Sequence, residues 1–151
     1  MLAELRSPER REKMRSSPAA ARYREALKVA SRNLKALADA GVAVVMGTDT
    51  GPPARFQGYF EHEELRLMVE AGLSPEQALL AATGGAARAL GLSDVGRLEP
   101  GAWADFLVLT ADPLADIRNT RRISGVVVNG RWLGPEELKG MLDRAAAEAA
   151  R

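Results

Sequence analysis

Hydrophobic positions recur at helical spacing in the first third of this chain of 151 residues. Apolar side chains between Tyr23 and Ala38 repeat at steps of three and four, which predicts a helix over residues 19–40 with one apolar stripe. Gly41 follows at the position where a left-handed residue commonly ends a helix. The charged stretch 1–18 contains two prolines and predicts a loop with a short helical turn, or a disordered segment.

A short, continuously apolar segment comes next, at residues 42–46, and most of its members are β-branched. Such a run is typical of a strand covered on both faces, as in a parallel sheet. The motif Gly47-Thr48-Asp49-Thr50-Gly51 stands at its carboxyl end. A loop rich in proline and glycine is expected over residues 52–59.

Helical spacing returns after this loop. It predicts a helix from about Glu61 to Gly72. A second helix begins at Ser74, because its side chain can accept a hydrogen bond from the backbone amide of Gln77 and Pro75 suits the first helical position. Another helical turn is expected over residues 86–90.

The pattern changes to β further along the chain. Phe106–Leu109 is a short apolar strand, and residues 126–128 and Arg131–Leu133 flank Asn129-Gly130, the commonest signal for a two-residue hairpin turn. Pro135 opens a final amphipathic helix rich in alanine. The order of elements indicates an α/β protein.

Composition narrows the classes of partner. The net charge is +1; the first 40 residues carry 10 Lys and Arg against 5 Asp and Glu, and we interpret this basic excess as a solvated helix face rather than a nucleic-acid site. The absence of cysteine excludes disulfides and thiolate metal sites and suits a cytoplasmic protein. No apolar run approaches the roughly 20 residues that cross a bilayer, so we expect no membrane partner.

Asp49 is the sharpest candidate for chemistry. Catalytic groups gather at the carboxyl ends of strands in α/β folds, and a carboxylate there can bind a divalent metal or accept a proton from water. The alternative is that Asp49 caps a following turn or helix, a role in which Asp is common. Spacing alone favours the capping alternative.

His62 is the only histidine of the chain. Its acidic neighbours suit a surface residue, and the functional alternative is a group that contacts substrate near the loop. One histidine without cysteine cannot supply the three protein ligands of a catalytic zinc site. Asp105 is interpreted as a turn or register residue, and the arginines Arg118, Arg121 and Arg122 as a solvated loop rather than an anion site.

Several motifs then occur in the order found in the C-terminal region of the amidohydrolase superfamily, which the chain resembles most closely in its imidazolonepropionase-like and prolidase-like branch. The matching stretches are Gly47-Thr48-Asp49, His62-Glu63-Glu64-Leu65, Gly72-Leu73-Ser74-Pro75-Glu76-Gln77-Ala78-Leu79, Ala82-Thr83, Gly96-Arg97-Leu98-Glu99-Pro100-Gly101 and Ala104-Asp105-Phe106-Leu107-Val108-Leu109. Each is modest alone, but their ordered series is specific and reverses the preference for Asp49 as a cap.

The resemblance implies a fold. It makes the chain the C-terminal portion of a metal-dependent (β/α)8 barrel, with residues 42–46 as the last strand, together with the C-terminal strands of a small β-sandwich. The implied division is 1–92 for the piece of the incomplete barrel, 93–134 for the sandwich strands and 135–151 for a C-terminal helix. Asp49 is then the catalytic, metal-associated aspartate, and His62 a substrate contact.

The resemblance also implies a function. It predicts hydrolysis of carbon–nitrogen bonds by water activated on a divalent metal, with Zn²⁺ as the expected ion, in an enzyme whose other metal ligands this chain lacks. The chain would then be a fragment, inactive alone, whose partner is the missing N-terminal part of the barrel or a complementary subunit. The alternative is a non-catalytic truncated homologue that acts as an interaction or homo-oligomerising domain.

Overall fold

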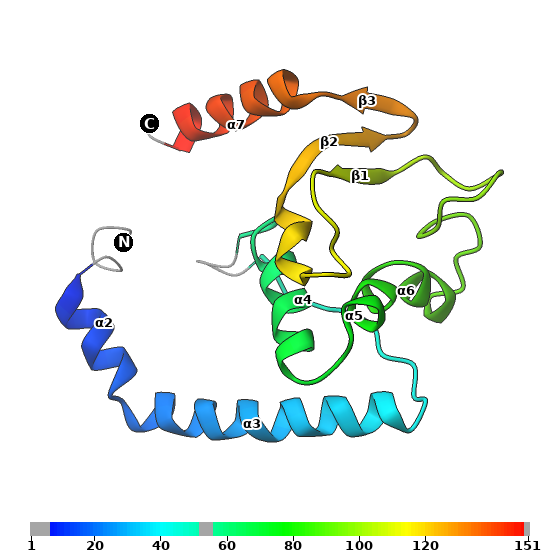
Figure 1. Cartoon of the computed structure of the whole chain (residues 1–151). Coiled ribbons are helices and arrows are strands. Elements are labelled where there is room, and N and C mark those ends of the chain that lie inside the picture. The colour runs from blue at the N-terminus through cyan, green and yellow to red at the C-terminus, as the bar shows by residue number, and fades with distance from the viewer. Residues whose placement is uncertain (1–6, 52–55, 150–151) are drawn as a thin grey trace.

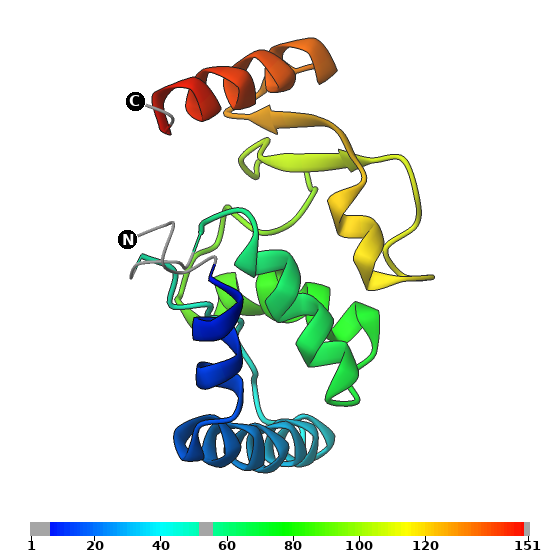
Figure 2. The same cartoon turned by 90° about the vertical axis from the view of Figure 1, so that its left-hand side faces the viewer.

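The chain folds as an α/β protein with a long helix on one side, a group of shorter helices in the middle and a small sheet beyond them (Figure 1). The computed structural model describes residues 7–51 and 56–149. The final helix lies on the far side of the sheet, as the rotated view also shows (Figure 2). The elements are α2 (Pro8–Arg15), α3 (Pro18–Asp39), α4 (Phe60–Glu70), α5 (Pro75–Ala82), α6 (Gly84–Ala89), β1 (Phe106–Leu109), the 3-10 helix η1 (Ile117–Arg121), β2 (Ile123–Val128), β3 (Arg131–Leu133) and α7 (Pro135–Ala149).

The sheet is antiparallel, with strand order β1-β2-β3. Asn129 and Gly130 both adopt positive φ, 50° and 76°, which the predicted two-residue hairpin turn requires. The Asp105 carboxylate accepts a hydrogen bond from the Asn129 amide and so joins the start of β1 to the hairpin turn, which agrees with its prediction as a turn or register residue. At Gly125 a Cβ atom would lie 1.8 Å from Cη2 of Trp132, so only glycine fits beneath that ring.

Local signals set the helix ends as predicted. Ser74 accepts from the Gln77 amide at 3.1 Å, and the Gln77 side chain accepts from the Ser74 amide at 2.8 Å. Gly41 follows α3 with φ 74° and confirms the expected left-handed residue. The stretch 1–18 contains more helix than the predicted short turn, since α2 has 8 residues; residues 1–6 lie outside the described part.

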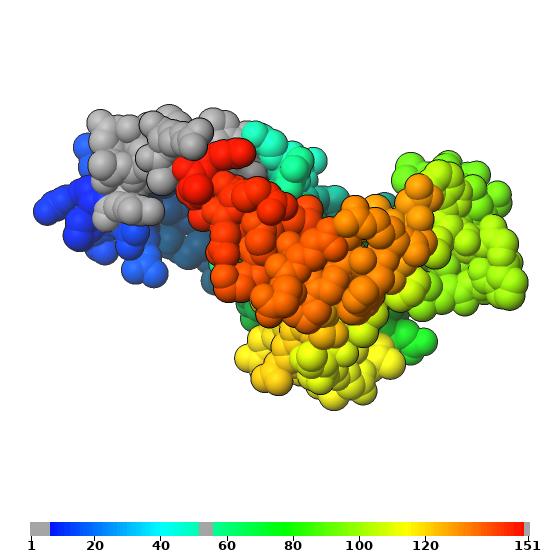
Figure 3. All heavy atoms as spheres, turned by 90° about the horizontal axis from the view of Figure 1, so that it is seen from above, coloured from blue at the N-terminus to red at the C-terminus, as the bar shows by residue number. Residues whose placement is uncertain are grey.

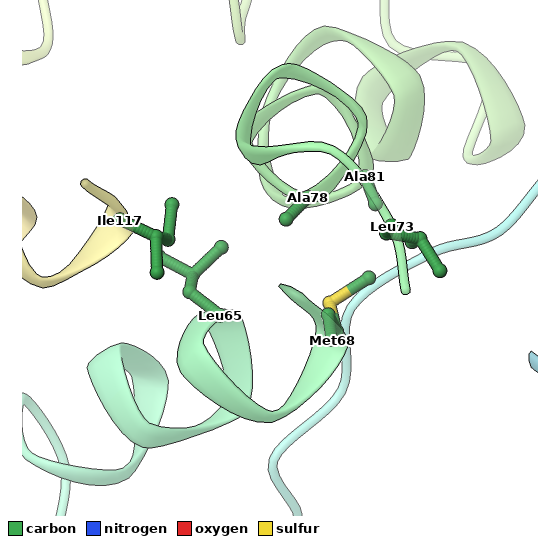
Figure 4. Packing of buried hydrophobic residues seen from close by; sticks show 6 residues of the cluster. All are labelled: Leu65, Met68, Leu73, Ala78, Ala81 and Ile117. Carbon is green, nitrogen blue, oxygen red and sulfur yellow. The ribbon is translucent and has the colours of Figure 1, made fainter. Parts of the chain in front are cut away.

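The core lies where α4, α5 and η1 meet (Figure 4). Its buried members are Leu65, Met68, Leu73, Ala78, Ala81 and Ile117. Helix α3 only borders this cluster, through the partly buried Leu34 and Ala38, and its other predicted stripe residues Tyr23, Leu27 and Leu37 are exposed. Neither α3 nor α7 contains a buried residue, so many apolar side chains of the described chain face solvent.

The prediction of a strand at residues 42–46 is wrong. The segment is extended but belongs to no sheet. In the described chain β1 pairs with β2 and β2 with β3, and no strand pairs with residues 42–46. Its amides instead bond to helix ends, Val42 to the Leu37 carbonyl and Met46 to the Ala81 carbonyl, both at 3.0 Å. Val44 and Met46 border the core whereas Val42 and Val45 are exposed, so the segment is covered on one face rather than both.

The loop that follows is only partly described, since residues 52–55 of the predicted loop 52–59 lie outside the described residues. Residues 56–59 lead directly into α4, as the expected loop would. Seen from above, α7 and β3 cover the centre of the molecule, and the segment between α6 and β1 projects at one side (Figure 3). No described helix is long and apolar enough to cross a membrane.

Candidate functional site

Asp49 is exposed and lies in the irregular stretch 47–51 that follows the extended segment 42–46. Its φ of 48° is left-handed, a conformation uncommon outside glycine but tolerated by Asp. The hydroxyls on either side of Asp49 tie this stretch to α4, because Thr48 and Thr50 donate to Oε1 of Glu61 at 3.3 and 3.2 Å. The N-cap of α4 is Tyr59, which makes no side-chain capping bond, so the alternative role of Asp49 as a cap is not seen at this helix.

A second carboxylate, Glu64 of α4, lies close enough to feel the charge of Asp49. Burial raises the pKa of Glu64, and the negative charge of Asp49 raises it further. Both effects favour the protonated acid, because desolvation and a like charge each disfavour the carboxylate. Glu64 therefore keeps its proton to a higher pH than an exposed glutamate, and Asp49 and Glu64 are the two acidic groups of the candidate site.

Glu61 behaves differently from Glu64. Its pKa is lowered, first by its own backbone amide and further by the Gly58 amide and the Thr50 and Thr48 hydroxyls, although partial burial opposes them. Glu61 is therefore a carboxylate at neutral pH. Its second oxygen, Oε2, is buried and has no hydrogen-bond partner of normal geometry in the described chain.

His62, the predicted substrate contact, is partly buried at the start of α4. Its Nδ1 lies 2.9 Å from Oγ1 of Thr120, a residue of η1 that is 4% exposed. The Thr120 hydroxyl also donates to the Ile117 carbonyl at 2.8 Å. Burial lowers the pKa of His62, and the positive charge of Arg121 lowers it further, against the opposing charges of Glu61 and Glu63.

Helix η1 is attached to α4 by a further set of contacts. Arg121 forms an ion pair with Glu63 at 2.5 Å, and its guanidinium lies 4.7 Å from the centre of the Tyr59 ring. Glu63 is also paired with Arg66 at 2.9 Å. The solvated loop expected around these arginines is therefore a 3-10 helix in which Arg121 is engaged. Arg118 is 72% exposed and pairs with Asp116, so it agrees better with the predicted solvated arginine.

A cavity of about 810 Å³ lies beside this contact, between α4, α5 and the sheet. Leu65, Leu79, Leu98, Phe106, Leu107, Leu109 and Ile123 supply most of its apolar wall. Glu61, His62 and Thr120 line it as well, and Asp49 does not. Asp49 is thus related to Glu64 through its charge, whereas His62, Thr120 and Glu61 line one cavity. The residues Thr48 and Thr50 connect the two groups through Glu61.

The described residues do not by themselves fit a catalytic metal site. Nowhere in residues 7–51 and 56–149 do three His, Cys, Asp or Glu side chains meet in a way that could hold an ion. Asp49 and Glu64 offer carboxylates, whereas catalytic zinc sites use three protein ligands. Sequence reasoning identified Asp49 and His62. It missed Glu64, whose only signal is its place in the same motif as His62, and Thr120, which carries no local signal.

Comparison with known proteins identifies the family of this chain. The profile of the Amidohydrolase family matches residues 5–133. The imidazolonepropionase of Deinococcus deserti is 44% identical over 91 residues, which are 60% of this chain and 23% of that protein. A match to the imidazolonepropionase of Cutibacterium acnes, 44% identical over 75 residues, covers 50% of this chain and 19% of that protein. The chain therefore spans only about a fifth of the curated relatives it matches.

Solved structures also match over most of this chain and about a quarter of their own length. The Xaa-Pro dipeptidase with bound methionine superposes with a TM-score of 0.62 at 28% identity, over 69% of this chain and 25% of that chain. The family profile covers most of the sequence, and it includes the Asp49 turn, α4 with His62, and η1. On this basis the chain belongs to the amidohydrolase family.

Proposed function

We propose that this chain contributes to an enzyme that hydrolyses carbon–nitrogen bonds, and that Asp49 is its catalytic carboxylate. The observation that carries the proposal is the family match together with the exposed Asp49, whose backbone is left-handed and whose charge reaches Glu64. Backbone conformations of this kind are concentrated at functional sites. The Xaa-Pro dipeptidase among the similar structures is named for cleaving dipeptides, which are joined by a C–N bond.

The role we assign to Asp49 is proton transfer. An exposed carboxylate can accept a proton from an attacking water and return it to the leaving nitrogen. The backbone on either side of Asp49 is attached to α4, because the Thr48 and Thr50 hydroxyls donate hydrogen bonds to Glu61. Glu64, whose pKa is raised by burial and by the negative charge of Asp49, adds a second acidic group within electrostatic range. His62 is proposed as a substrate contact.

We further propose that activity requires groups beyond those described here. A divalent metal, which we expect to be Zn²⁺, would need ligands in addition to Asp49, because the described residues hold no complete site. An N-terminal part of a (β/α)8 barrel or a complementary subunit would supply them, with residues 1–92 completing the barrel and 93–134 a small β-sandwich. The chain alone is then inactive. The family match supports this proposal over a purely structural, oligomerising role.

The test is Asp49→Asn in the complete or reconstituted enzyme, screened on dipeptides and cyclic amides. We expect turnover to fall by about 10²- to 10⁴-fold, because the amide cannot accept the proton. Asp143→Asn on α7, an exposed aspartate paired with Lys139, is the matched control and should keep normal turnover. An Asp49→Asn enzyme with normal turnover would show that Asp49 is not the catalytic carboxylate.

A further inference from the structure

The hydrogen bonds around Thr120 determine which nitrogen of His62 carries a proton. The Thr120 hydroxyl has one hydrogen, and its oxygen lies 2.8 Å from the Ile117 carbonyl and 2.9 Å from Nδ1 of His62. A carbonyl oxygen only accepts, so the hydroxyl must donate to Ile117. The contact with His62 is then favourable only if Nδ1–H donates to Thr120. Thr120 is only 4% exposed, so little of its surface is open to water.

The remaining nitrogen of His62 is consequently an acceptor. In the neutral ring one nitrogen donates and the other accepts, so a protonated Nδ1 leaves a lone pair on Nε2. Burial and the charge of Arg121 favour this neutral ring by lowering its pKa. Nε2 has no hydrogen-bond partner in the part of the chain that the structure describes. His62 lines the cavity of about 810 Å³, which is where such a partner can bind.

The cavity wall shows what kind of partner suits this acceptor. Its size lies within the range of about 300–1,000 Å³ typical of small-ligand pockets, and most of its wall is apolar. Glu61 and Asp105 also line the wall, but their carboxylates already accept hydrogen bonds, from Thr48 and Thr50 and from the Asn129 amide. The His62 ring is bonded through Nδ1, so Nε2 remains the acceptor open to a ligand. Among the described lining residues, Arg97 supplies a guanidinium, which is already paired with Glu99 at 2.8 Å. A ligand that donates N–H from an apolar body fits these groups.

We propose that this cavity binds ligands that carry an N–H donor on an apolar body, that Nε2 of His62 accepts that hydrogen, and that Thr120 is the positioning residue that keeps Nε2 unprotonated. The proposal rests on the proposed function, in which His62 contacts substrate, and deepens it by naming the chemistry recognised. Its tests measure ring protonation and probe binding. Neither requires turnover, so their outcome is independent of Asp49.

The first test is the protonation state of the ring. His62 is the only histidine, so its ring signals in ¹⁵N-resolved NMR need no assignment. We expect the Nδ1–H form at neutral pH in the wild type and in Thr120→Ser, which keeps the hydroxyl. In Thr120→Val the ring should change to the Nε2–H form that predominates in free histidine. Thr110→Val, which removes an exposed hydroxyl that donates to the Arg122 carbonyl, is the control and should leave the ring unchanged.

The second test compares benzamide with methyl benzoate, which has nearly the same shape but no N–H donor. Both are titrated into the chain at concentrations below the onset of association. Benzamide should bind about two- to tenfold more tightly, the worth of one net hydrogen bond, and should shift the Nε2 signal. Thr120→Val should abolish this preference and Thr120→Ser should restore it.

Each contrary result would overturn the proposal. An Nε2–H ring in the wild type would mean that Thr120 does not set the protonation state. Equal affinity for the two probes, or a preference for benzamide that persists in Thr120→Val, would mean that His62 Nε2 is not the acceptor.

Discussion

Replacing Arg121 with methionine should loosen the attachment of η1 to α4. Methionine keeps an apolar stem of similar length but has no charge. The change removes the ion pair with Glu63 and the contact of the guanidinium with the Tyr59 ring. It leaves Ile117 and Thr120 of η1 in place.

The expected loss of stability follows from how exposed the contacts of Arg121 are. The Arg121 and Glu63 side chains are 39% and 25% exposed, so their pair contributes about 0.2–1 kcal/mol. A cation over an aromatic ring at a partly exposed site contributes about 0.5–1 kcal/mol. Glu63 retains its pair with Arg66 and is not left uncompensated. We therefore expect the free energy of unfolding to fall by about 1–2 kcal/mol at neutral pH.

The same substitution should change the titration of His62. Arg121 lowers the pKa of His62, so its removal should raise that pKa. A histidine with a depressed pKa in the folded state contributes stability above its unfolded pKa of about 6.5, and this stability is lost as the pH falls toward the folded pKa. In Arg121→Met the pKa of His62 is depressed less, so less stability is lost as the pH falls. The stability difference between the two proteins should therefore narrow between pH 7 and pH 5.

Urea unfolding at both pH values, with NMR titration of the single histidine, measures these effects. Arg118→Met is the matched control, since it makes the same change on the same helix at a side chain that is 72% exposed. Its cost should stay within about 0.5 kcal/mol. Equal costs for the two variants, or an unchanged His62 pKa in Arg121→Met, would refute the assigned role of Arg121.

Two further predictions concern the chain on its own. It should bind Zn²⁺ only weakly in a calorimetric titration, because the described residues offer no group of three ligands, and stoichiometric binding tighter than about micromolar would contradict this. It should also associate or bind dyes specific for apolar surface, since Tyr23, Leu27 and Val45 are among many exposed apolar side chains and residues 42–46 lack a paired strand. A monomer by light scattering with a sharp melt and no dye binding would argue against the fragment hypothesis.

Features encoded by neighbouring residues could be predicted from sequence. The hairpin at Asn129-Gly130 was predicted because its two residues must adopt positive φ, which few other pairs tolerate. The start of α5 was predicted because Ser74, Pro75 and Gln77 satisfy one another within a single turn. Asp49 was identified by its position after an apolar run and by the ordered family motifs. Its catalytic role remains a prediction.

Features that depend on distant partners could not be predicted in this way. The apolar run at 42–46 has the composition of a strand, but a strand requires a neighbouring backbone, and the described chain does not provide one there. The contacts of Thr120 with His62 and of Arg121 with Glu63 each join residues 58 apart in sequence. No local pattern specifies such a pairing, so Thr120 was overlooked and Arg121 was assigned to a solvated loop.

The short helix η1 joins the two parts that the family resemblance implies, residues 1–92 and residues 93–134. Ile117 and Thr120 lie three residues apart, which places them on the same face of a 3-10 helix, and both are buried against α4. Residues from either side of the boundary proposed at 92 and 93 thus share one core. His62 is held by Thr120 of η1 as well as by its own helix α4. A substitution near η1 can therefore alter the His62 ring without any contact with Asp49, and the two candidate roles can be separated by mutation.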